Sequence, residues 1–381
     1  MWITTSLDTA KRPTAIALGN FDGVHLGHRQ VIQPVLRDRA PAFTAPASPP
    51  KTLPDQIDQR FFETTSPSSV GGYSTWAPDA QPTPSANPAN VMPQGNVLAN
   101  AKALPCYTTV LTFNPHPQEY FSGQPRRLLT PLNEKATQLK LMGVDQIVLL
   151  PFNQTLANLS PEAFVEDILI GRLQAQHISV GADFRFGYRR AGTADLLNAI
   201  AADHGIPVTI VPLKLIHDDI RISSSSIREA LLQGNLDRVR QRLGRSYSLT
   251  GRVVMGQQLG RTLGFPTANL KLPEEKFIPC QGVYGVWVHG ISGDGDREVP
   301  QPGVMNIGVR PTVSGHEQTV EVHVLNWSGD LYDKMLTVEL IAFLRAEQKF
   351  DSLDQLKAQI QADCETALQL FPVGDRAYRA S

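Results

Sequence analysis

The sequence predicts two consecutive domains, an α/β domain of the doubly wound type and a small antiparallel β-barrel. With 381 residues, of which 41% are hydrophobic, the chain is long enough for two cores. Apolar, strand-like runs alternate with helical periodicity up to about residue 244, which is typical of a parallel sheet covered by helices. From about Tyr247 the periodicity changes to strands, and one helix closes the chain. We therefore predict domains at 1–244 and 245–381.

The first domain begins with a glycine-rich turn between a strand and a helix. An apolar run at 15–18 is followed by GNFDGVHLGH at 19–28 and then by an amphipathic stretch. Such a turn points backbone N–H groups and the positive end of a helix at its occupant, and a polyphosphate fits that environment. A simple capping turn would explain one histidine. It would not explain His25, His28 and Asp22 together on one short loop.

Two features interrupt the first domain. Pro34 stands where the helix that begins near His28 should continue, and because proline lacks the backbone N–H we expect this helix to kink or stop early. Residues 41–105 hold 12 of the 29 prolines, few charges and no sustained periodicity. We interpret them as an insertion that buries too little apolar surface to fold and is largely disordered.

The remaining elements of the first domain alternate regularly. Buried strands are expected at 107–113, 146–150, 177–181 and 208–211. Helices are expected to open at Thr130-Pro131, Ser160-Pro161 and Thr193, and glycines at 143 and 205 are expected to end the first and the third. In such folds ligands bind beyond the carboxyl ends of the strands, where the segments 19–28, 113–118, 181–187 and 222–228 would meet.

The last of these segments resembles a second phosphate contact. Ser223 to Ser226 open a helix that we expect to run to Gly234, with Arg228 close to its start. Hydroxyl groups, free amides and a guanidinium at one helix start suit a phosphate. An ordinary serine cap with a solvated arginine explains this segment equally well when it is taken alone.

The second domain has strand-like segments at 249–255, 283–289, 304–307, 319–325 and 336–344, and a helix at 351–370. Valines 320, 322 and 324 share one face of their strand, so Glu321 and His323 share the other. Such a carboxylate is usually only solvent-facing. The segment 256–270, GQQLGRTLGFPTANL, adds glycines for close approach of phosphate and two hard oxygen ligands for Mg²⁺, Thr267 and Asn269. The sequence contains no P-loop motif.

Composition excludes several classes of partner. A net charge of −1 argues against a general electrostatic grip on nucleic acid or an anionic membrane. The three cysteines are far apart, and no signal peptide or membrane-spanning run is visible, so we expect a cytoplasmic protein. The sequence leaves a weak homo-oligomer open.

Ten short segments gain weight from their order and spacing. They are GNFDGVHLGH (19–28), TFNPHP (112–117), GADFRFG (181–187), SSSSIR (223–228), GRTLGFPTANL (260–270), GVYGV (282–286), NIGVRPT (306–312), TVEVH (319–323), DLY (330–332) and LRAEQKF (344–350). In these segments the chain resembles the prokaryotic bifunctional riboflavin kinase/FMN adenylyltransferase (FAD synthetase) family. The resemblance covers nearly everything except 41–105.

The resemblance implies a Rossmann-like nucleotidyltransferase domain of the HxGH type and a six-stranded antiparallel riboflavin kinase barrel with a terminal helix. It implies two reactions, phosphorylation of riboflavin by ATP to FMN and adenylylation of FMN by a second ATP to FAD and pyrophosphate. Riboflavin, FMN and ATP would be the substrates and Mg²⁺ the cofactor. An alternative is a monofunctional riboflavin kinase whose first domain is inactive or regulatory. A flavin- or nucleotide-binding protein without turnover is the third reading.

Site residues follow from matching positions. For adenylyl transfer the catalytic donors would be His25, His28 and Arg228, which meet charge on the α-phosphate and the departing pyrophosphate. The residues that would bind ATP or FMN there are Gly19, Asn20, Phe21, Asp22, Gly27, Asn114, Asp183, Phe184, Ser224 and Ser225. For the kinase step Glu321 would take the proton of the riboflavin hydroxyl, and Thr267 and Asn269 would hold Mg²⁺. The residues that would bind ATP or riboflavin are Gly256, Gly260, Arg261, Gly264, Pro266, Tyr284, Asn306 and Arg345.

Three positions depart from the family pattern. Ser225 stands where threonine is usual, which keeps the hydroxyl group. Asn326 replaces an aspartate, and Asp333 replaces a glycine after the DLY motif. The loss of a charge at 326 could alter flavin or metal affinity. Phe184 and Phe186 are as consistent with core packing as with a ring contact.

Overall fold

The computed structural model describes residues 1–36, 106–212, 215–216, 220–256, 258–291, 299–312 and 315–371. All of these belong to one compact unit. The insertion predicted at 41–105 lies outside the described residues. In the described part of the chain, no helix has both the length and the apolar composition needed to cross a membrane.

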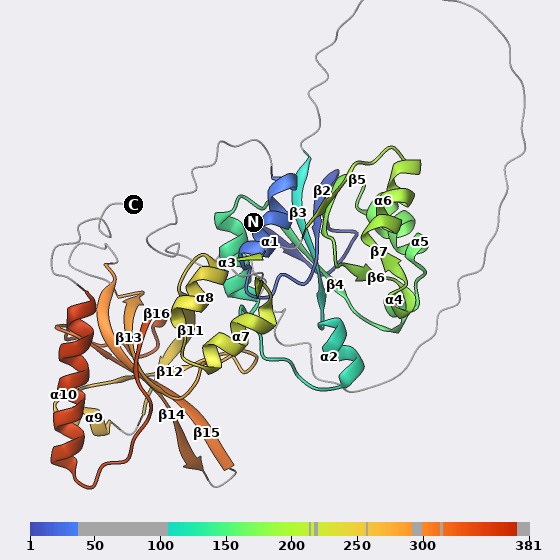
Figure 1. The fold of residues 1–381 in the computed structure, drawn as a ribbon. Coiled ribbons are helices and arrows are strands. Elements are labelled where there is room, and N and C mark those ends of the chain that lie inside the picture. The colour runs from blue at the N-terminus through green and yellow to red at the C-terminus, as the bar shows by residue number, and fades with distance from the viewer. Residues whose placement is uncertain are drawn as a thin grey trace, which may run out of the picture. The chain divides into compact units, whose positions relative to one another are not determined.

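The first part of the chain forms a six-stranded parallel sheet in the order β1-β4-β3-β2-β5-β8 (Figure 1). The strands are β1 (Trp2–Thr4), β2 (Thr14–Leu18), β3 (Tyr107–Asn114), β4 (Gln146–Pro151), β5 (Ala175–Gly181) and β8 (Val208–Val211). The predicted parallel sheet is therefore confirmed. The short edge strand β1 was not predicted, because three residues are too few to show a period and pairing with β4 decides their conformation.

Helices connect these strands and lie on both faces of the sheet (Figure 1). They are α1 (Leu26–Ile32), the 3₁₀ turn η1 (Gln33–Val35), α2 (Pro117–Ser122), α3 (Leu132–Leu141), α4 (Gln154–Ala157), α5 (Pro161–Ala163), the π-helical η3 (Phe164–Arg172), the 3₁₀ turn η4 (Tyr188–Arg190) and α6 (Ala194–Asp203). Two small hairpins pair β6 (Arg185–Phe186) with β7 (Gly192–Thr193) and β9 (Leu215–Ile216) with β10 (Ile220–Arg221).

The predicted helix boundaries are confirmed. The hydroxyl groups of Ser160 and Thr193 accept backbone N–H groups at the starts of α5 and α6. Gly143 and Gly205 take left-handed φ values of 90° and 70° just past α3 and α6. Helix α1 stops before Pro34 and continues only as the turn η1, as the missing proline N–H requires.

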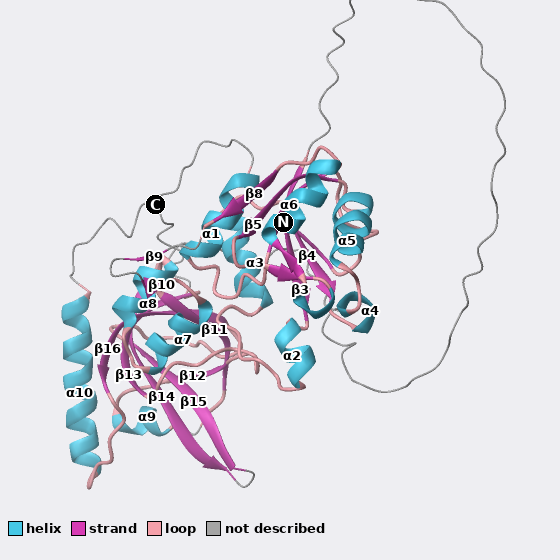
Figure 2. Cartoon of the chain, turned by 45° about the vertical axis from the view of Figure 1, so that its right-hand side comes forward, coloured by secondary structure: helices cyan, strands magenta, loops and turns pink. Residues whose placement is uncertain are grey.

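The second part of the chain forms a closed antiparallel barrel in the order β11-β12-β15-β14-β13-β16. Its strands are β11 (Tyr247–Val254), β12 (Ala268–Lys271), β13 (Gly282–His289), β14 (Gln301–Thr312), β15 (Gly315–Val324) and β16 (Met335–Arg345). The six-stranded barrel is confirmed. Periodicity alone showed five strands, because the four residues of β12 follow a glycine- and proline-rich stretch. Helix α9 (Leu259–Leu263) precedes β12, and the terminal helix α10 (Leu353–Leu370) packs on β13, β14 and β16 (Figure 2).

Helices α7 (Ser224–Leu232) and α8 (Leu236–Leu243) share their core with the barrel. Leu231, Val239 and Leu243 are buried in the same apolar cluster as Tyr247 and the inward-facing valines of the barrel strands. The sequence analysis placed both helices in the first domain, because they precede the predicted boundary after residue 244. The predicted boundary after Gly244 falls in the short connection between α8 and β11, and it stays a prediction.

A buried ion pair joins α3 to the segment between β12 and β13. The Lys276 side chain has no exposed surface, and its Nζ donates to Glu134 Oε2 at 2.5 Å and to the Leu129 carbonyl at 2.8 Å. The same ammonium group lies 4.4 Å from the ring centroid of Tyr247. Burial raises the pKa of Glu134 and lowers that of Lys276, and their mutual attraction opposes both shifts.

Removing one member of this pair should destabilise the fold. We expect Lys276→Met to lower the free energy of unfolding by about 3–5 kcal/mol, because Glu134 would then be buried without its cation. Urea denaturation followed by tryptophan fluorescence measures the change. Lys357→Met, an exposed position on α10, is the matched control. The double variant Glu134→Met/Lys276→Met should recover most of the loss, and a double variant as unstable as the single one would contradict this account.

Candidate active sites

The loop between β2 and α1 follows a tight, partly left-handed path. Phe21, Gly23 and Val24 have φ values of 51°, 89° and 42°. The backbone angle favours glycine at position 23, and a Cβ atom there would also lie 2.9 Å from Leu129 Cδ1, so the leucine side chain would have to shift. Phe21 and Val24 are held in this unfavourable region by nearly complete burial. These constraints fix the path of the loop directly before the start of α1.

Two stacked histidines stand at the start of α1. His25 is the N-cap residue, and its Nδ1 accepts the backbone N–H of His28 at 3.2 Å. The two imidazole rings are stacked, with centroids 3.5 Å apart and planes 13° apart. The Nδ1 atom of His28 is buried and has no hydrogen-bond partner among the residues that the structure describes. Burial, followed by the charges of His25 and Lys135, lowers the pKa of His28 well below its ordinary value. His28 is therefore neutral near pH 7.

Asp22 ties this loop to the start of α7. Its carboxylate forms an ion pair with Arg228 and accepts the backbone N–H of Thr130 at 3.2 Å. Its backbone carbonyl accepts the Ser224 hydroxyl at 2.8 Å. Side-chain exposure is 4% for Asp22 and 15% for Arg228, so water screens the pair little. The structure thus brings together the two segments that the sequence singled out for phosphate, and it gives Asp22 a structural partner.

Lys135 on α3 is a candidate that the sequence analysis missed. It is buried, its Nζ donates to the Asn20 carbonyl at 3.1 Å, and burial lowers its pKa against the opposing charge of Asp22. A signal was present, because Lys135 falls on the same helical face as the apolar Ala136 and Leu139. A lysine on the buried stripe of a helix usually has a specific partner.

The carboxyl ends of β3 and β5 carry the other predicted residues of this site. Asn114 ends β3 and is exposed, and Asp183 is exposed in the turn after β5. Phe184 is half-buried and stacks on Phe186, with centroids 5.8 Å apart. Phe186 is buried in the core beside the sheet, so these two rings form a packing pair, and a ligand contact of Phe184 stays a prediction.

His116 was quoted in a motif but not predicted as a site residue. It caps α2, where its Nδ1 accepts the backbone N–H of Gln118 at 3.0 Å. Burial, followed by the positive charge of Arg126, lowers the pKa of His116 to about 4. The charges of Asp22, Lys135 and Arg228 also act on it, which places it in the same electrostatic environment as the loop.

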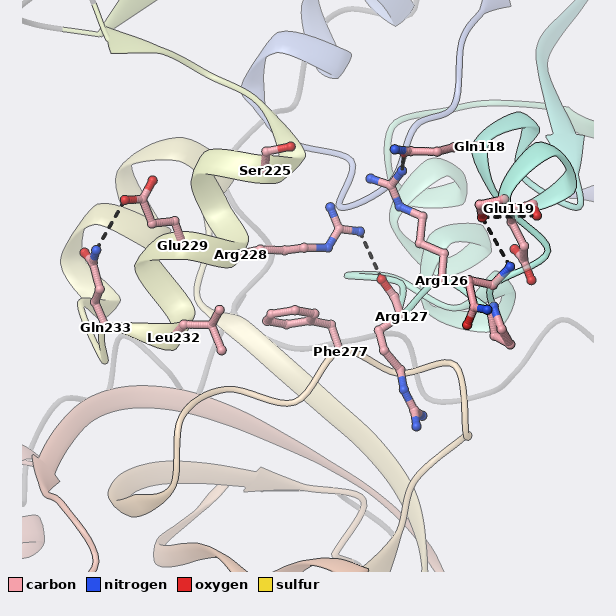
Figure 3. A pocket seen from close by; sticks show the side chains of 13 residues that line it. Gln118, Glu119, Arg126, Arg127, Ser225, Arg228, Glu229, Leu232, Gln233 and Phe277 are labelled. Carbon is pink, nitrogen blue, oxygen red and sulfur yellow. Dashed lines mark hydrogen bonds between the residues drawn. The ribbon is translucent and has the colours of Figure 1, made fainter.

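A cavity of about 860 Å³ opens beside Arg228 and Ser225 (Figure 3). The segment after α2 contributes Arg126 and Arg127, and Phe277 comes from the chain between β12 and β13. Arg228 also donates to the Arg127 carbonyl at 3.0 Å, as Figure 3 shows. The cavity lining therefore combines arginine side chains with the carboxylates of Glu119 and Glu229 and with one aromatic ring.

The barrel brings its predicted residues together through strand register. Glu321 on β15 pairs with Asn269 on β12 and with Asn306 on β14. Val320 and Val322 are buried in the barrel, so Glu321 and the two asparagines lie in one row on its outer face, as the alternation predicted. Two consecutive strands and the more distant β12 thus place one carboxylate between two amides.

Glycines allow the chain to pass close to this row. A Cβ atom on Gly256 would overlap the Asn269 side chain. One on Gly260 would overlap the Phe265 carbonyl and lie 3.3 Å from Thr267 Oγ1. Gly264 is favoured for a different reason: a Cβ atom there would meet no described atom within 4 Å, but the residue ends α9 with a φ of 90°. The Nδ1 of His323 lies 2.8 Å from the Pro266 carbonyl, so the histidine holds this segment against β15.

Of three other predicted kinase residues, two have structural partners and one is exposed. Tyr284 is buried inside the barrel, and its hydroxyl donates to the Cys280 carbonyl at 2.5 Å. Arg345 forms a two-pronged ion pair with Asp363 of α10, with Nε to Oδ1 at 2.9 Å and the terminal nitrogen to Oδ2 at 2.7 Å. Arg261 is exposed on α9. Contacts of these three side chains with ATP or riboflavin stay predictions.

Both barrel residues that depart from the family pattern occupy left-handed backbone positions. Asn326 and Asp333 have φ values of 53° and 62°. Asparagine and aspartate adopt this left-handed region at a lower cost than most residues. Asp333 can therefore occupy a turn position where a glycine is usual without rebuilding the turn.

Comparison with known proteins matches both halves of the chain. The FAD synthetase family model matches residues 7–43 and 93–226, and the riboflavin kinase model matches residues 243–371. A bifunctional riboflavin kinase/FMN adenylyltransferase from Escherichia coli K12 is 42% identical over 264 residues, which cover 69% of this chain and 82% of that protein. One of the same description from Haemophilus influenzae is 33% identical and covers 94% of each chain. A crystal structure described as a macrolide-efflux protein from Streptococcus pneumoniae aligns with a TM-score of 0.69 and 25% identity over 96% of this chain and 98% of that one.

The low pKa of His116 is directly testable. Its imidazole should titrate near pH 4 in the folded protein, measured by the NMR shift of its ring protons. Because the unfolded histidine takes up a proton at about pH 6.5 and the folded one does not, the folded state should lose stability as the pH falls from 6.5 towards 4. Arg126→Gln should raise the pKa, since it removes a neighbouring positive charge. Arg127→Gln is the matched control, and an equal shift in both variants would contradict the assignment.

Proposed function

Because the chain belongs to the bifunctional riboflavin kinase/FMN adenylyltransferase family, we infer that its two reactions are divided between the two sites described above. The enzyme phosphorylates riboflavin with ATP to FMN, and it adenylylates FMN with ATP to FAD and pyrophosphate. One observation supports this division of the two reactions: one family model covers the loop at 19–28, and the other covers Glu321. Coverage by both models favours two activities over a kinase with an idle first domain.

We assign adenylyl transfer to the loop between β2 and α1. The FMN phosphate already carries a charged oxygen nucleophile, so this site needs hydrogen-bond donors rather than a strong base. The helix start with His25 and His28 would take the ATP phosphates, and Arg228 would approach the α-phosphate from the side of α7. A bound triphosphate places negative charge beside His28 and raises its pKa, which makes it a better donor.

Lys135 supports this assignment. Its ammonium group lies under the loop, against the Asn20 carbonyl, and adds positive charge that water screens little. The same loop would be shaped by Gly19, Phe21 and Gly27. Ser225 would line the cavity. The partners that we propose for the whole chain are therefore small molecules, namely riboflavin, FMN and ATP, with no nucleic acid.

We assign riboflavin phosphorylation to the outer row of the barrel. Glu321 would accept the proton of the primary hydroxyl of riboflavin as the bond to the γ-phosphorus forms. Among the described residues no group of three His, Cys, Asp or Glu side chains is arranged to hold a metal ion. The oxygens of Thr267 and Asn269 suit Mg²⁺ when ATP phosphates complete the ligand set. When bound, Mg²⁺ would neutralise charge on those phosphates.

Glu321→Gln should separate the two activities. Incubation with riboflavin, ATP and Mg²⁺, followed by chromatography that resolves FMN from FAD, should show FAD from the wild type. We expect the variant to lose roughly 10²- to 10⁴-fold in riboflavin phosphorylation, because the base is removed. It should still convert added FMN to FAD. Glu365→Gln, on the exposed face of α10, is the control. Equal loss of both activities would contradict the assignment.

His28→Ala should give the reverse pattern. Loss of a donor to the phosphates should reduce FAD formation by roughly 10²- to 10³-fold, while FMN accumulates from riboflavin. The same product analysis measures both compounds in one reaction. His204→Ala, at the exposed end of α6, is the control. A wild-type yield of FAD from the His28 variant would remove this histidine from the mechanism.

A further inference from the structure

The connection between α8 and β11 brings an arginine to the loop between β2 and α1. Gly244 ends α8 with a left-handed φ of 70°, and a Cβ atom there would lie 2.5 Å from Leu26 Cδ2, so this turn packs directly against α1. The next residue, the half-buried Arg245, donates from Nη2 to the Gly23 carbonyl at 2.9 Å. Its Nη1 atom is buried and has no hydrogen-bond partner among the described residues. The chain that enters the barrel is thus in direct contact with the loop.

The Arg245 guanidinium stays charged in these surroundings. Burial, followed by the positive charge of Arg29, lowers the pKa of Arg245 to about 10, and the negative charge of Glu134 opposes the shift. A group with this pKa is protonated at pH 7. Its hydrogen bond to the Gly23 carbonyl is therefore charge-assisted, and such bonds are stronger than those between neutral groups.

The peptide group that Arg245 holds lies next to a strained residue. Gly23 and Val24 have φ values of 89° and 42°, and the second value is unfavourable for a β-branched side chain. The Gly23 N–H donates to Thr130 Oγ1 at 2.8 Å, so both polar backbone groups of Gly23 bind side chains that are distant in sequence. Because a peptide group is planar, fixing the Gly23 carbonyl also fixes the direction of the Val24 N–H. Loss of the arginine would allow this peptide group to rotate, since rotation relieves the strain at Val24.

We propose that Arg245 is a positioning residue for adenylyl transfer, which holds the peptide group between Gly23 and Val24 so that the start of α1 keeps its donors aimed at the ATP phosphates. This inference rests on the proposed assignment of adenylyl transfer to this loop. His25 follows Val24 directly, and its Nδ1 accepts the His28 N–H at 3.2 Å. The arrangement of both histidines therefore begins at the peptide group that Arg245 binds. Arg245 acts through the loop rather than on a substrate.

The consequence is that the kinase half of the sequence supports the adenylyltransferase site. Arg245 lies within the region matched by the riboflavin kinase model, 243–371, whereas the loop lies within the region matched by the FAD synthetase model. The alternative is a purely structural role, like that of the pair of Lys276 and Glu134. A structural residue would affect stability and both activities together, whereas a positioning residue affects the rate of one reaction.

Steady-state kinetics on the full chain test the proposal. Arg245→Met should lower kcat for FAD formation by roughly 10- to 100-fold, because a charge-assisted hydrogen bond to the loop is lost. The KM for FMN should change by less than about twofold, since the displaced donors act on charge that develops in the transition state. Riboflavin phosphorylation should be unchanged, and it reports a folded barrel. Arg242→Met, which removes a buried arginine from the last turn of α8, is the matched control.

Rescue experiments separate positioning from general stability. Arg245→Lys keeps the cation and a donor, so it should recover most of the lost kcat. In Arg245→Ala, guanidinium ion added at millimolar concentration should raise the rate of FAD formation severalfold, and it should have no such effect on Arg242→Ala. An unchanged kcat in Arg245→Met, an equal loss of riboflavin phosphorylation, or a defect that neither rescue reverses would overturn the proposal. Failure of the wild type to make FAD would instead reject the proposed function.

Discussion

The ion pair between Asp22 and Arg228 is the contact on which the first site depends. It joins a loop after β2 to a helix some 200 positions later in the chain, and both side chains are shielded from water. Around it, Thr130, just before α3, and Ser224 of α7 bind the same loop. Because the arginine is already paired, its guanidinium is oriented before any substrate arrives, which lowers the reorganisation that catalysis would otherwise require.

Burial also prepares this site for an anion. It lowers the pKa values of His28, His116 and Lys135, three cationic or potentially cationic groups around one loop. Burial disfavours the charged forms of these groups more than the negative charge of Asp22 favours those of His116 and Lys135. A polyphosphate reverses that balance, so binding of ATP and charging of the donors would reinforce each other. In the second site, strand register in a closed barrel places Glu321 in one row with Asn269 and Asn306.

Helix α7 explains why the two sites are coupled in structure although they are separate in chemistry. Its first turn binds the loop through Ser224 and Arg228, and its apolar face is buried with the barrel strands. The pair of Glu134 and Lys276 makes a second connection between the same regions. Through these contacts the loop at 19–28 is connected to the barrel core, and the position of Phe277 follows from this arrangement.

Much of the molecule was determined by local sequence. Helix starts at Ser160 and Thr193, the stop before Pro34 and the alternation around Glu321 were all predictable, because capping, proline geometry and strand periodicity act over a few residues. The motifs were sufficient to identify the family and both reactions. Other features depended on contacts between distant segments. The conformations of β1 and β12 are decided by their neighbouring strands, and Lys135 is seen to face the loop only when α3 is packed. The partners of Asp22, the placement of α7 on the barrel core and the arrival of Phe277 at the cavity were decided by tertiary structure, because burial and charge pairing are properties of residues that meet in space.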